Sequence, residues 1–443
     1  MTQPDGFDPS PFVSFDVRED MTTHTGPLVE PYDVDSAVPS AEPEFQTQDM
    51  LLNVGPSHPA MHGIIRIVTR LQGELVVDSE VEIGYLHRAF EKHTEDCTWN
   101  QALIYTDRLN YVSPVINNVG YCMAVEKLLC IELPPRGQYI RVMLSEISRI
   151  SDHLTCVGAQ AMELGAFTVF LYLIKAREWM YELLEDYCGA RVTTNACRVG
   201  GMPFDLRDGW LDKVTWAVKE TRAVLAECDT MLTNLRIFVD RTQGIGVMSP
   251  ERAIAWGWTG PLLRATGVAY DVRKDFPYLI YDQLDWTVPV GRNGDVFDRY
   301  LVRMEELVQS CNILDQCVAR IPGGPVNSNN KQVVLPAKKD TYGNIEGLMN
   351  HFKLIMYGHG IRVPEGEAYF AVEGGNGELG FYVVSHPDPN AQDGCNDMPW
   401  RVRVRPPCYN FVAALPEQIN GYMVADIVPT FGSVNMIGGE LDH

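Results

Sequence analysis

The stretch QYIRVMLSEISRISDHL (residues 138–154) indicates which class of fold this sequence adopts. Its apolar side chains recur every three or four residues, which is the spacing of one face of an α-helix. The same spacing recurs in FLYLIKAREWMYELLEDY (170–187), GWLDKVTWAVKETRAVL (209–225) and FDRYLVRMEELVQSCNIL (297–314). Helices owe most of their stability to packing of such faces against one another, so the sequence predicts a mostly helical core.

Strands are expected on either side of this helical core. The alternation of apolar and polar residues in IIRIVTRL (64–71) and ELVVDSEVEI (74–83) predicts a small N-terminal β element. A Gly/Pro/Asn-rich linker, IPGGPVNSNN (321–330), precedes an expected helix near 344–357. Three strand-like runs follow that helix, EAYFAV, GFYVVS and RVRVR, so the predicted fold class is α+β.

The sequence divides into four expected parts. Residues 1–47 carry seven prolines and many carboxylates but few large aliphatic side chains, so we predict an acidic, extended arm that cannot bury a core of its own. The parts that follow are the β element (48–83), the helical core (84–330) and a mixed α/β segment (331–443).

Composition excludes several classes of function. A formal net charge of −22 argues against binding to nucleic acid and against direct docking on anionic lipid. The longest apolar run, GAFTVFLYLI (165–174), has about half of the ~20 residues that a membrane-spanning helix needs. The N-terminus shows no secretory or organelle-targeting pattern. We therefore expect a cytosolic protein, or one that contacts a membrane only through partners.

The loop NVGPSHPAMHG (53–63) contains the most informative histidines of the chain, His58 and His62. Histidines four residues apart usually indicate a metal pair on a helix, but Pro59 lies between them and disfavours that helix. Pro56 restricts the backbone further. We therefore predict a shaped loop, neither helix nor ordinary strand, that holds an imidazole against a ligand.

Gly375, Gly377 and Gly380 match the glycine pattern of a dinucleotide-binding motif. That motif needs a strand before the glycines and a helix after them, so that the helix N-terminus meets the pyrophosphate. Here a strand-like run, residues 381–385, follows instead. We predict a hairpin connection and no NAD site.

Charged residues within the predicted helices have two interpretations. Glu146, Arg149 and His153 share one face of an otherwise apolar helix, which favours a structural Glu–Arg contact over a catalytic site. Glu163 precedes a wholly apolar run, where burial would raise its pKa toward neutrality and suit it to relay protons. Alternatively, Glu163 faces solvent at the end of a helix.

The segment GYLHRAFEKHTEDCTWNQALIYTDRLNY (84–111) is dense in side chains that can take part in catalysis. A catalytic cluster and a solvated helix face with ion pairs four residues apart are both compatible with it. The side chains in question are His87, Arg88, Glu91, Lys92, His93, Asp107, Arg108 and Tyr111.

Ten collinear blocks resemble one known family, from about Met50 to the C-terminus. They are NVGPSHPAMHG, IGYLHRAFEK, YTDRLNYVSP, AVEKLL, MLSEISRISDHL, GARVTTNACRVGG, GVAYDVRKDFPY, VPVGRNGDVFDRYLVRMEEL, GELGFYVVS and RVRVRPP. Together they resemble the quinone-site subunit, known as the D subunit, of bacterial NADH:quinone oxidoreductase, or respiratory complex I. That family is itself similar to the large subunit of nickel–iron hydrogenases, which implies a hydrogenase-like helical core.

The resemblance implies a site that reduces quinone beside the terminal iron–sulfur cluster of an adjoining subunit. His62 matches the family histidine that contacts the quinone head group, and Tyr111 matches the tyrosine on its other side. Arg88 matches an arginine near the cluster. His58 and Gly63 belong to the same loop, where they line the quinone site or shape it. Imidazole and phenol suit this role because both hydrogen-bond carbonyl oxygens and both can supply protons to a reduced quinone.

Three positions depart from the family pattern. Glu163 replaces an aspartate that is thought to pair with the loop histidine, so its carboxylate reaches one methylene farther. The run Ala196-Cys197-Arg198 replaces tyrosine–isoleucine–arginine and alters a packing surface. His443 stands where relatives carry an arginine.

The resemblance also implies what surrounds the chain. The chain itself is expected to bind no cofactor; quinone is the substrate, and partner subunits carry FMN and the iron–sulfur clusters. The implied partners are the cluster-bearing B subunit, the C subunit and other peripheral-arm and membrane-arm subunits. The implied activity passes electrons to ubiquinone or menaquinone, coupled to proton translocation. The implied location is peripheral, on the cytoplasmic side of the bacterial inner membrane.

Three alternative functions remain at this stage. A hydrogenase large subunit needs two Cys-x-x-Cys pairs, and none of the eleven cysteines forms one. A relative of complex I with another electron donor, such as ferredoxin, would share these motifs. A non-catalytic scaffold is disfavoured because His62, Tyr111 and a carboxylate at Glu163 are all present.

Overall fold

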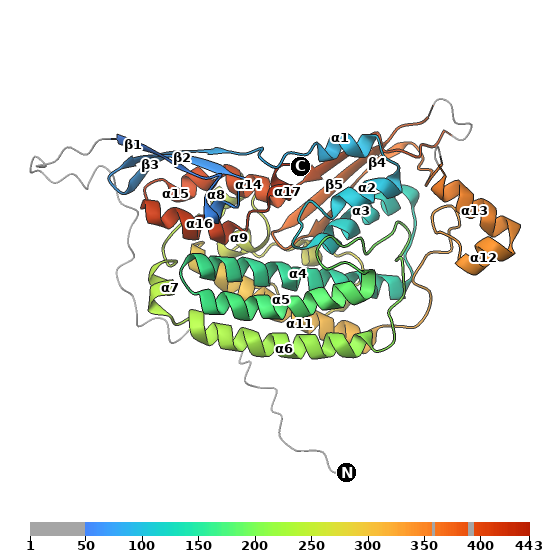
Figure 1. The fold of residues 1–443 in the computed structure, drawn as a ribbon, viewed down its shortest axis with the longest axis horizontal. Helices are drawn as coiled ribbons and strands as arrows, with labels where there is room; N and C mark the ends of the chain where they lie inside the picture. The colour runs from blue at the N-terminus through green and yellow to red at the C-terminus, as the bar shows by residue number, and fades with distance from the viewer. Residues whose placement is uncertain (1–48, 357–358, 389–393) are drawn as a thin grey trace, which may run out of the picture. The chain divides into compact units, whose positions relative to one another are not determined.

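The structure is a computed structural model that describes residues 49–356, 359–388 and 394–443. Long helices lie side by side in it (Figure 1). The arm predicted at 1–47 lies outside the described residues. The four predicted long helices are confirmed, and each extends beyond its predicted range at one end at least. They are α4 (Pro135–Glu163), α5 (Phe167–Cys188), α6 (Trp210–Leu232) and α11 (Val296–Arg320).

The sequence explains where α4 begins and ends. Pro135 occupies the first turn, where its missing N–H is not needed and its fixed φ suits a helix. Gly165, just beyond the last helical residue, adopts a φ of +91° that favours glycine and ends the helix before α5 starts. The two helices thereby become neighbours that pack along their lengths.

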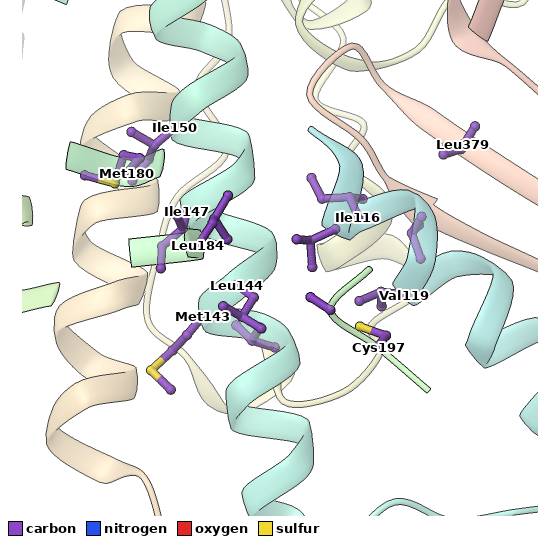
Figure 2. Close-up of a cluster of buried hydrophobic side chains, with 14 of the residues drawn as sticks. Ile116, Val119, Met143, Leu144, Ile147, Ile150, Met180, Leu184, Cys197 and Leu379 are labelled. Carbon is purple, nitrogen blue, oxygen red and sulfur yellow. The ribbon is translucent and has the colours of Figure 1, made fainter. Parts of the chain in front are cut away.

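The main core is built around α4. Figure 2 shows apolar side chains of α4 between those of α5 and those of α3 (Pro114–Leu129), and α3 in turn packs against the C-terminal sheet. Gly120 of α3 faces this sheet so closely that a Cβ there would lie 2.8 Å from Phe381. Cys197, one of the positions that departs from the family pattern, is fully buried in the same core. The labelled core residues are Ile116, Val119, Met143, Leu144, Ile147, Ile150, Met180, Leu184, Cys197 and Leu379.

Two three-stranded antiparallel sheets complete the described architecture, which confirms the α+β class with a mostly helical core. The N-terminal sheet has the order β1-β2-β3 and the C-terminal sheet the order β4-β5-β6. The strands are β1 (Asp49–Val54), β2 (Arg66–Gln72), β3 (Leu75–Glu82), β4 (Gly366–Glu373), β5 (Glu378–Ser385) and β6 (Arg401–Arg405).

The glycines that resemble a dinucleotide motif form the predicted hairpin. β4 ends at Glu373 and β5 begins at Glu378, so the turn is Gly374–Gly377. Gly375 must be glycine there, because a Cβ would lie 2.1 Å from a carboxylate oxygen of Asp152 on α4. The turn therefore fixes the C-terminal sheet against the central helix.

Shorter helices connect these elements. The predicted helix near 344–357 is confirmed as α13 (Ile345–Ile355). The others are α1 (Phe90–Glu95), α2 (Trp99–Thr106), α7 (Arg236–Asp240), α8 (Pro250–Ala255), α9 (Gly260–Ala265), α10 (Val272–Asp275), α12 (Lys338–Gly343), α14 (Pro407–Ala413), α15 (Leu415–Ile419), α16 (Ile427–Val434), α17 (Gly438–Leu441) and the 3₁₀ turns η2 (Pro59–Met61), η3 (Tyr281–Gln283) and η4 (Val424–Asp426).

A second core joins the two ends of the described chain. Apolar residues of the N-terminal sheet and its loop pack with those of α14, α15, α16 and α17. The backbone also closes this unit, because Val76 of β3 donates to the carbonyl of Tyr422 and accepts from the N–H of Gly421. The loop at 53–63 is thereby held against the C-terminal helices.

A network of buried charges links α4 to the rest of the main core. Arg149 pairs with Glu146 at 3.3 Å, which confirms the predicted structural contact, and His153 contacts Glu306 of α11 at 2.8 Å. Arg149 also donates to the backbone oxygens of Glu373 and Gly374 at the β4–β5 turn, at 2.6 and 2.7 Å. The members of the network, all buried, are Glu146, Arg149, His153, Arg264, Asp271, Arg273, Glu306 and Glu373.

Arg264 of α9 connects three carboxylates of this network. It lies 2.6 Å from Glu306, 2.9 Å from Glu373 and 3.3 Å from Asp271. Burial would raise the pKa of the Glu306 carboxyl. The guanidinium groups of Arg264 and Arg273 and the hydrogen bond with His153 instead hold this pKa well below its usual range. Loss of Arg264 would leave Glu373 buried without an ion pair and would remove one partner each from Glu306 and Asp271, which is far more costly than loss of an exposed pair.

We therefore predict that Arg264→Met lowers the free energy of unfolding by about 3–5 kcal/mol in urea titrations. Arg236→Met is the matched control, since Arg236 is 92% exposed and pairs with Asp240 on the surface. The control should unfold like the wild type. Equal losses in the two variants would contradict the structural importance of the network.

Candidate functional site

The loop between β1 and β2 has a defined shape. Gly55 adopts a φ of +88°, and a Cβ there would lie 2.4 Å from the carbonyl oxygen of Ile65. His58 caps the single 3₁₀ turn η2, because its Nδ1 accepts from the N–H of Ala60 at 3.2 Å. The prediction of neither helix nor ordinary strand is wrong at two places, because Asn53 and Val54 belong to β1 and residues 59–61 form this turn. The turn is possible because Pro59 occupies a first-turn position.

His62 follows this turn in a left-handed conformation, with a φ of 55°. Its side chain is exposed, whereas the preceding Met61 is fully buried in the second core and anchors the loop. Partial desolvation by the surrounding protein lowers the pKa of His62, which favours the neutral imidazole. A neutral ring offers one N–H donor and one acceptor nitrogen at the surface of the loop.

Gly438 and Gly439, at the start of α17, form the junction where the site-bearing segments meet. A Cβ at Gly438 would lie 2.6 Å from Ile64, two residues beyond His62. A Cβ at Gly439 would lie 2.4 Å from the carbonyl oxygen of Arg108 and 3.0 Å from the guanidinium of Arg88. Only glycine permits this close approach. The junction therefore brings the loop and the segment 84–111 together.

Tyr111 lies at the same junction, half-buried against the second core. Burial raises the pKa of Tyr111 and the nearby Cys408 thiol adds to the rise, while a backbone hydrogen bond from Gly438 and the charge of Arg88 oppose it. The phenol is therefore protonated at neutral pH and available as a donor. Arg88 itself is exposed and donates to the carbonyl oxygen of Arg108 at 2.8 Å.

A buried polar cluster centred on Asp152 of α4 supports this region, and the sequence analysis did not find it. Asn110 and Ser113, which flank Tyr111, donate to Asp152 at 3.1 and 2.8 Å. Asn435, which follows α16, donates to the other carboxylate oxygen at 2.9 Å. The only sequence signal was a carboxylate between Ser151 and His153 on an apolar helix face. The partners come from two segments, one at residues 110–113 and one at Asn435, that no local pattern connects with Asp152.

Glu440 anchors α17 to the start of α14. Its buried carboxylate accepts from the backbone N–H of Cys408 at 3.1 Å, at the N-terminus of α14. Burial raises the pKa of Glu440 to about 7. This contact fixes α17, and with it the two junction glycines.

Glu163 ends α4 and lies apart from the junction. A Cβ at Gly432 of α16 would lie 2.4 Å from its Oε2, and the loop turn η2 also contacts α16. Within the described ranges, Oε2 of Glu163 is buried without a hydrogen-bond partner. Burial raises the pKa of Glu163 to about 7, as predicted for a desolvated carboxylate. Glu163 therefore lies at a helix end, as the alternative expected, but it is half-buried and its Oε2 is shielded from solvent.

Known proteins resemble the chain over most of its length. Residues 163–443 match the family described as the 49 Kd subunit of respiratory-chain NADH dehydrogenase. The D subunit of NADH-quinone oxidoreductase from Myxococcus xanthus is 50% identical over 90% of this chain and 94% of its own length. The D 1 subunit of the same enzyme from Sorangium cellulosum is 49% identical over 93% and 99%, respectively.

The chain belongs to the D-subunit family of NADH-quinone oxidoreductase. The resemblance identified from ten sequence blocks is thereby confirmed, and the chain is a subunit of that oxidoreductase complex, complex I. A further relative, the C/D subunit of Bdellovibrio bacteriovorus, is 51% identical over 88% of this chain and 68% of its own length.

Within this member of the family, charged side chains of the segment 84–111 form ion pairs, whereas a catalytic role for the segment stays a prediction. Glu91 pairs with Arg401 at 2.7 Å and Lys92 with Glu95 at 2.6 Å, so these charges stabilise structure. Arg88 and Tyr111 lie at the junction instead. His443 lies 3.5 Å from Glu91, and burial lowers the pKa of its imidazole, which favours the neutral ring.

Across residues 49–356, 359–388 and 394–443, no group of three or more His, Cys, Asp or Glu side chains is placed to hold a metal ion. Within the same ranges, the helices are all too short or too polar to cross a bilayer.

The buried position of Glu163 predicts a pH-dependent stability. The folded chain keeps a proton on this carboxyl up to about pH 7, whereas the unfolded chain releases it above the ordinary value of 4.5. Folding stability should therefore fall as pH rises from about 4.5 to about 7. Glu163→Gln should remove on the order of 2 kcal/mol of this fall in urea titrations at about pH 5 and about pH 8.

The matched control for this experiment is Glu182→Gln, an exposed glutamate on α5. It should keep the pH dependence of the wild type. If Glu163→Gln also keeps it, the carboxyl of Glu163 is not desolvated in the folded chain.

Proposed function

We propose that this chain binds the head group of a membrane quinone at the Gly438–Gly439 junction and promotes its two-electron reduction. The observation that carries the proposal is the convergence of three segments at those glycines. The loop that bears His62, the arginine Arg88 and the phenol of Tyr111 all lie at or beside them. Membership of the D-subunit family supports quinone as the substrate class.

His62 and Tyr111 supply the hydrogen bonds that reduction requires. Two-electron reduction of a quinone creates negative charge on two carbonyl oxygens, and two protons complete the product. The neutral imidazole of His62 and the protonated phenol of Tyr111 each donate to such an oxygen. Donors fixed where charge develops lower the barrier to reduction.

The remaining site residues position these donors or replace their protons. His58 holds the loop turn that precedes His62, and Gly63 lets the chain leave the turn with a φ of +80°. Glu163, whose pKa is about 7, serves as the proton reservoir near α16. Arg88 provides a positive charge at the junction that favours the arrival of electrons.

The electrons come from outside the chain. An iron–sulfur cluster in an adjoining B subunit supplies them, and FMN and further clusters lie in other subunits. The C/D subunit of the Bdellovibrio relative supports the C subunit as a second neighbour. Membrane-arm subunits would bring the site to the cytoplasmic side of the inner membrane and couple reduction to proton translocation. The chain itself then acts as a peripheral component.

Substitution of the two donors tests this function. In the assembled enzyme, His62→Ala and Tyr111→Phe should each lower the rate of NADH:quinone reduction by about 10²-fold or more, because each removes a donor to the developing charge. NADH:ferricyanide reduction should remain unchanged, since that electron path ends upstream of the quinone.

His93→Ala is the matched control for His62. His93 lies in the segment 84–111 but stacks on Tyr105, with ring centroids 6.1 Å apart, and is not at the junction. The control should keep quinone reduction. If His62→Ala and Tyr111→Phe keep full activity as well, the chain acts as a scaffold and the proposed function is wrong.

A further inference from the structure

The helical hairpin α12–α13 presents an uncovered apolar face. Figure 1 shows the two helices projecting from the end of the described unit, beyond the C-terminal sheet. Ile345 is 82% exposed and Phe352 is 45% exposed, although both are large apolar residues on the same helix. The exposed apolar side chains of this hairpin are Tyr342, Ile345, Leu348, Met349, Phe352, Ile355 and Met356.

These side chains follow the spacing of a recognition helix. From Ile345, the exposed apolar positions of α13 fall at intervals of three and four residues, so they form one stripe. Amphipathic helices that bind in a groove of another protein carry such a stripe. The opposite side of α13 buries only Gly347 and Leu354 in this chain.

The hairpin is preformed in this chain although its apolar face is bare. Asn344 caps α13, since its side chain accepts from the N–H of Glu346. Lys331 then pairs with Glu346 at 2.8 Å and ties the helix to the preceding linker. Because an eleven-residue helix is marginal in water without packing, a further surface that covers the stripe would stabilise it.

The charge of this region is opposite to that of the chain. Residues 331–356 contain four lysines against two acidic residues, whereas the whole chain carries a net charge of −22. Lys338 and Lys339 begin α12, and Lys353 follows Phe352 in α13. A partner with carboxylates around an apolar groove would complement both the stripe and its lysines.

We propose that α12–α13 docks into an apolar groove with an acidic rim on another protein subunit of the same oxidoreductase complex. Phe352 and Leu348 insert into the groove, and Lys338, Lys339 and Lys353 face the rim. This interface is independent of the quinone site, because none of its residues lies at the Gly438–Gly439 junction.

Cross-linking in the assembled enzyme tests the contact directly. A photoreactive phenylalanine analogue placed at position 352 should form one covalent adduct, with another subunit of the complex, at its acidic surface. The same analogue at Trp216, an exposed position on α6, is the control and should not label that acidic surface. Mass spectrometry of the adduct identifies the contacted peptide.

Substitution tests the chemistry of the contact. Leu348→Ser combined with Phe352→Ser should lower co-purification of the subunit that cross-linking identifies at least tenfold. The reason is that central apolar anchors carry most of the affinity of an interface. Lys338→Glu combined with Lys339→Glu should do the same at low salt. Lys219→Glu, an exposed lysine on α6, should have no effect.

Several results would overturn the proposal. Adducts with lipid would indicate a membrane-surface helix, and adducts with a second copy of this chain would indicate self-association. Adducts with residues 1–47 of the same chain would indicate an intramolecular contact. Wild-type co-purification of both double variants would show that the stripe is not an interface. Circular dichroism of the variants verifies that the exposed substitutions leave the fold intact. The outcome of the His62→Ala experiment does not bear on this interface, so the docking proposal and the proposed function can fail separately.

Discussion

The buried charge network around Arg264 and Glu306 is the constraint on which the rest of the structure depends. Each charge in it is desolvated, so each is tolerated only when its partners are in place. Those partners come from α4, α9, α10, α11 and β4, which are far apart in the sequence. The network therefore requires these elements to pack against one another. Arg149 extends it to the β4–β5 turn by donating to the backbone oxygens of Glu373 and Gly374.

This closure determines where the candidate site lies. The β4–β5 turn rests on Asp152, which also holds Asn110 and Asn435. Asn110 fixes the segment that ends in Tyr111, while Asn435 precedes the junction glycines. The second core then presses the His62 loop against α16 and α17. Site residues in exposed or half-buried positions are thus placed by contacts that are buried or half-buried, which limits their freedom to move.

Local patterns were enough to predict much of this arrangement. Apolar spacing predicted the long helices, and alternation predicted the strands, because each depends on residues close in sequence. The Glu146–Arg149 contact and the desolvation of Glu163 were predicted for the same reason. The Asp152 cluster and the glycine junction were not, since each needs side chains from segments more than a hundred residues apart. The resemblance to the family selected His62 and Tyr111, whereas the structure shows why their segments meet.

Photolabelling of the assembled enzyme with a photoreactive quinone analogue tests whether a quinone head group binds at the junction of the His62 loop and Tyr111. If it binds there, residues 53–63 and the peptide that ends at Tyr111 should be labelled, and excess quinone should protect both. Label confined to other regions of this chain, or to other subunits alone, would contradict binding at this junction.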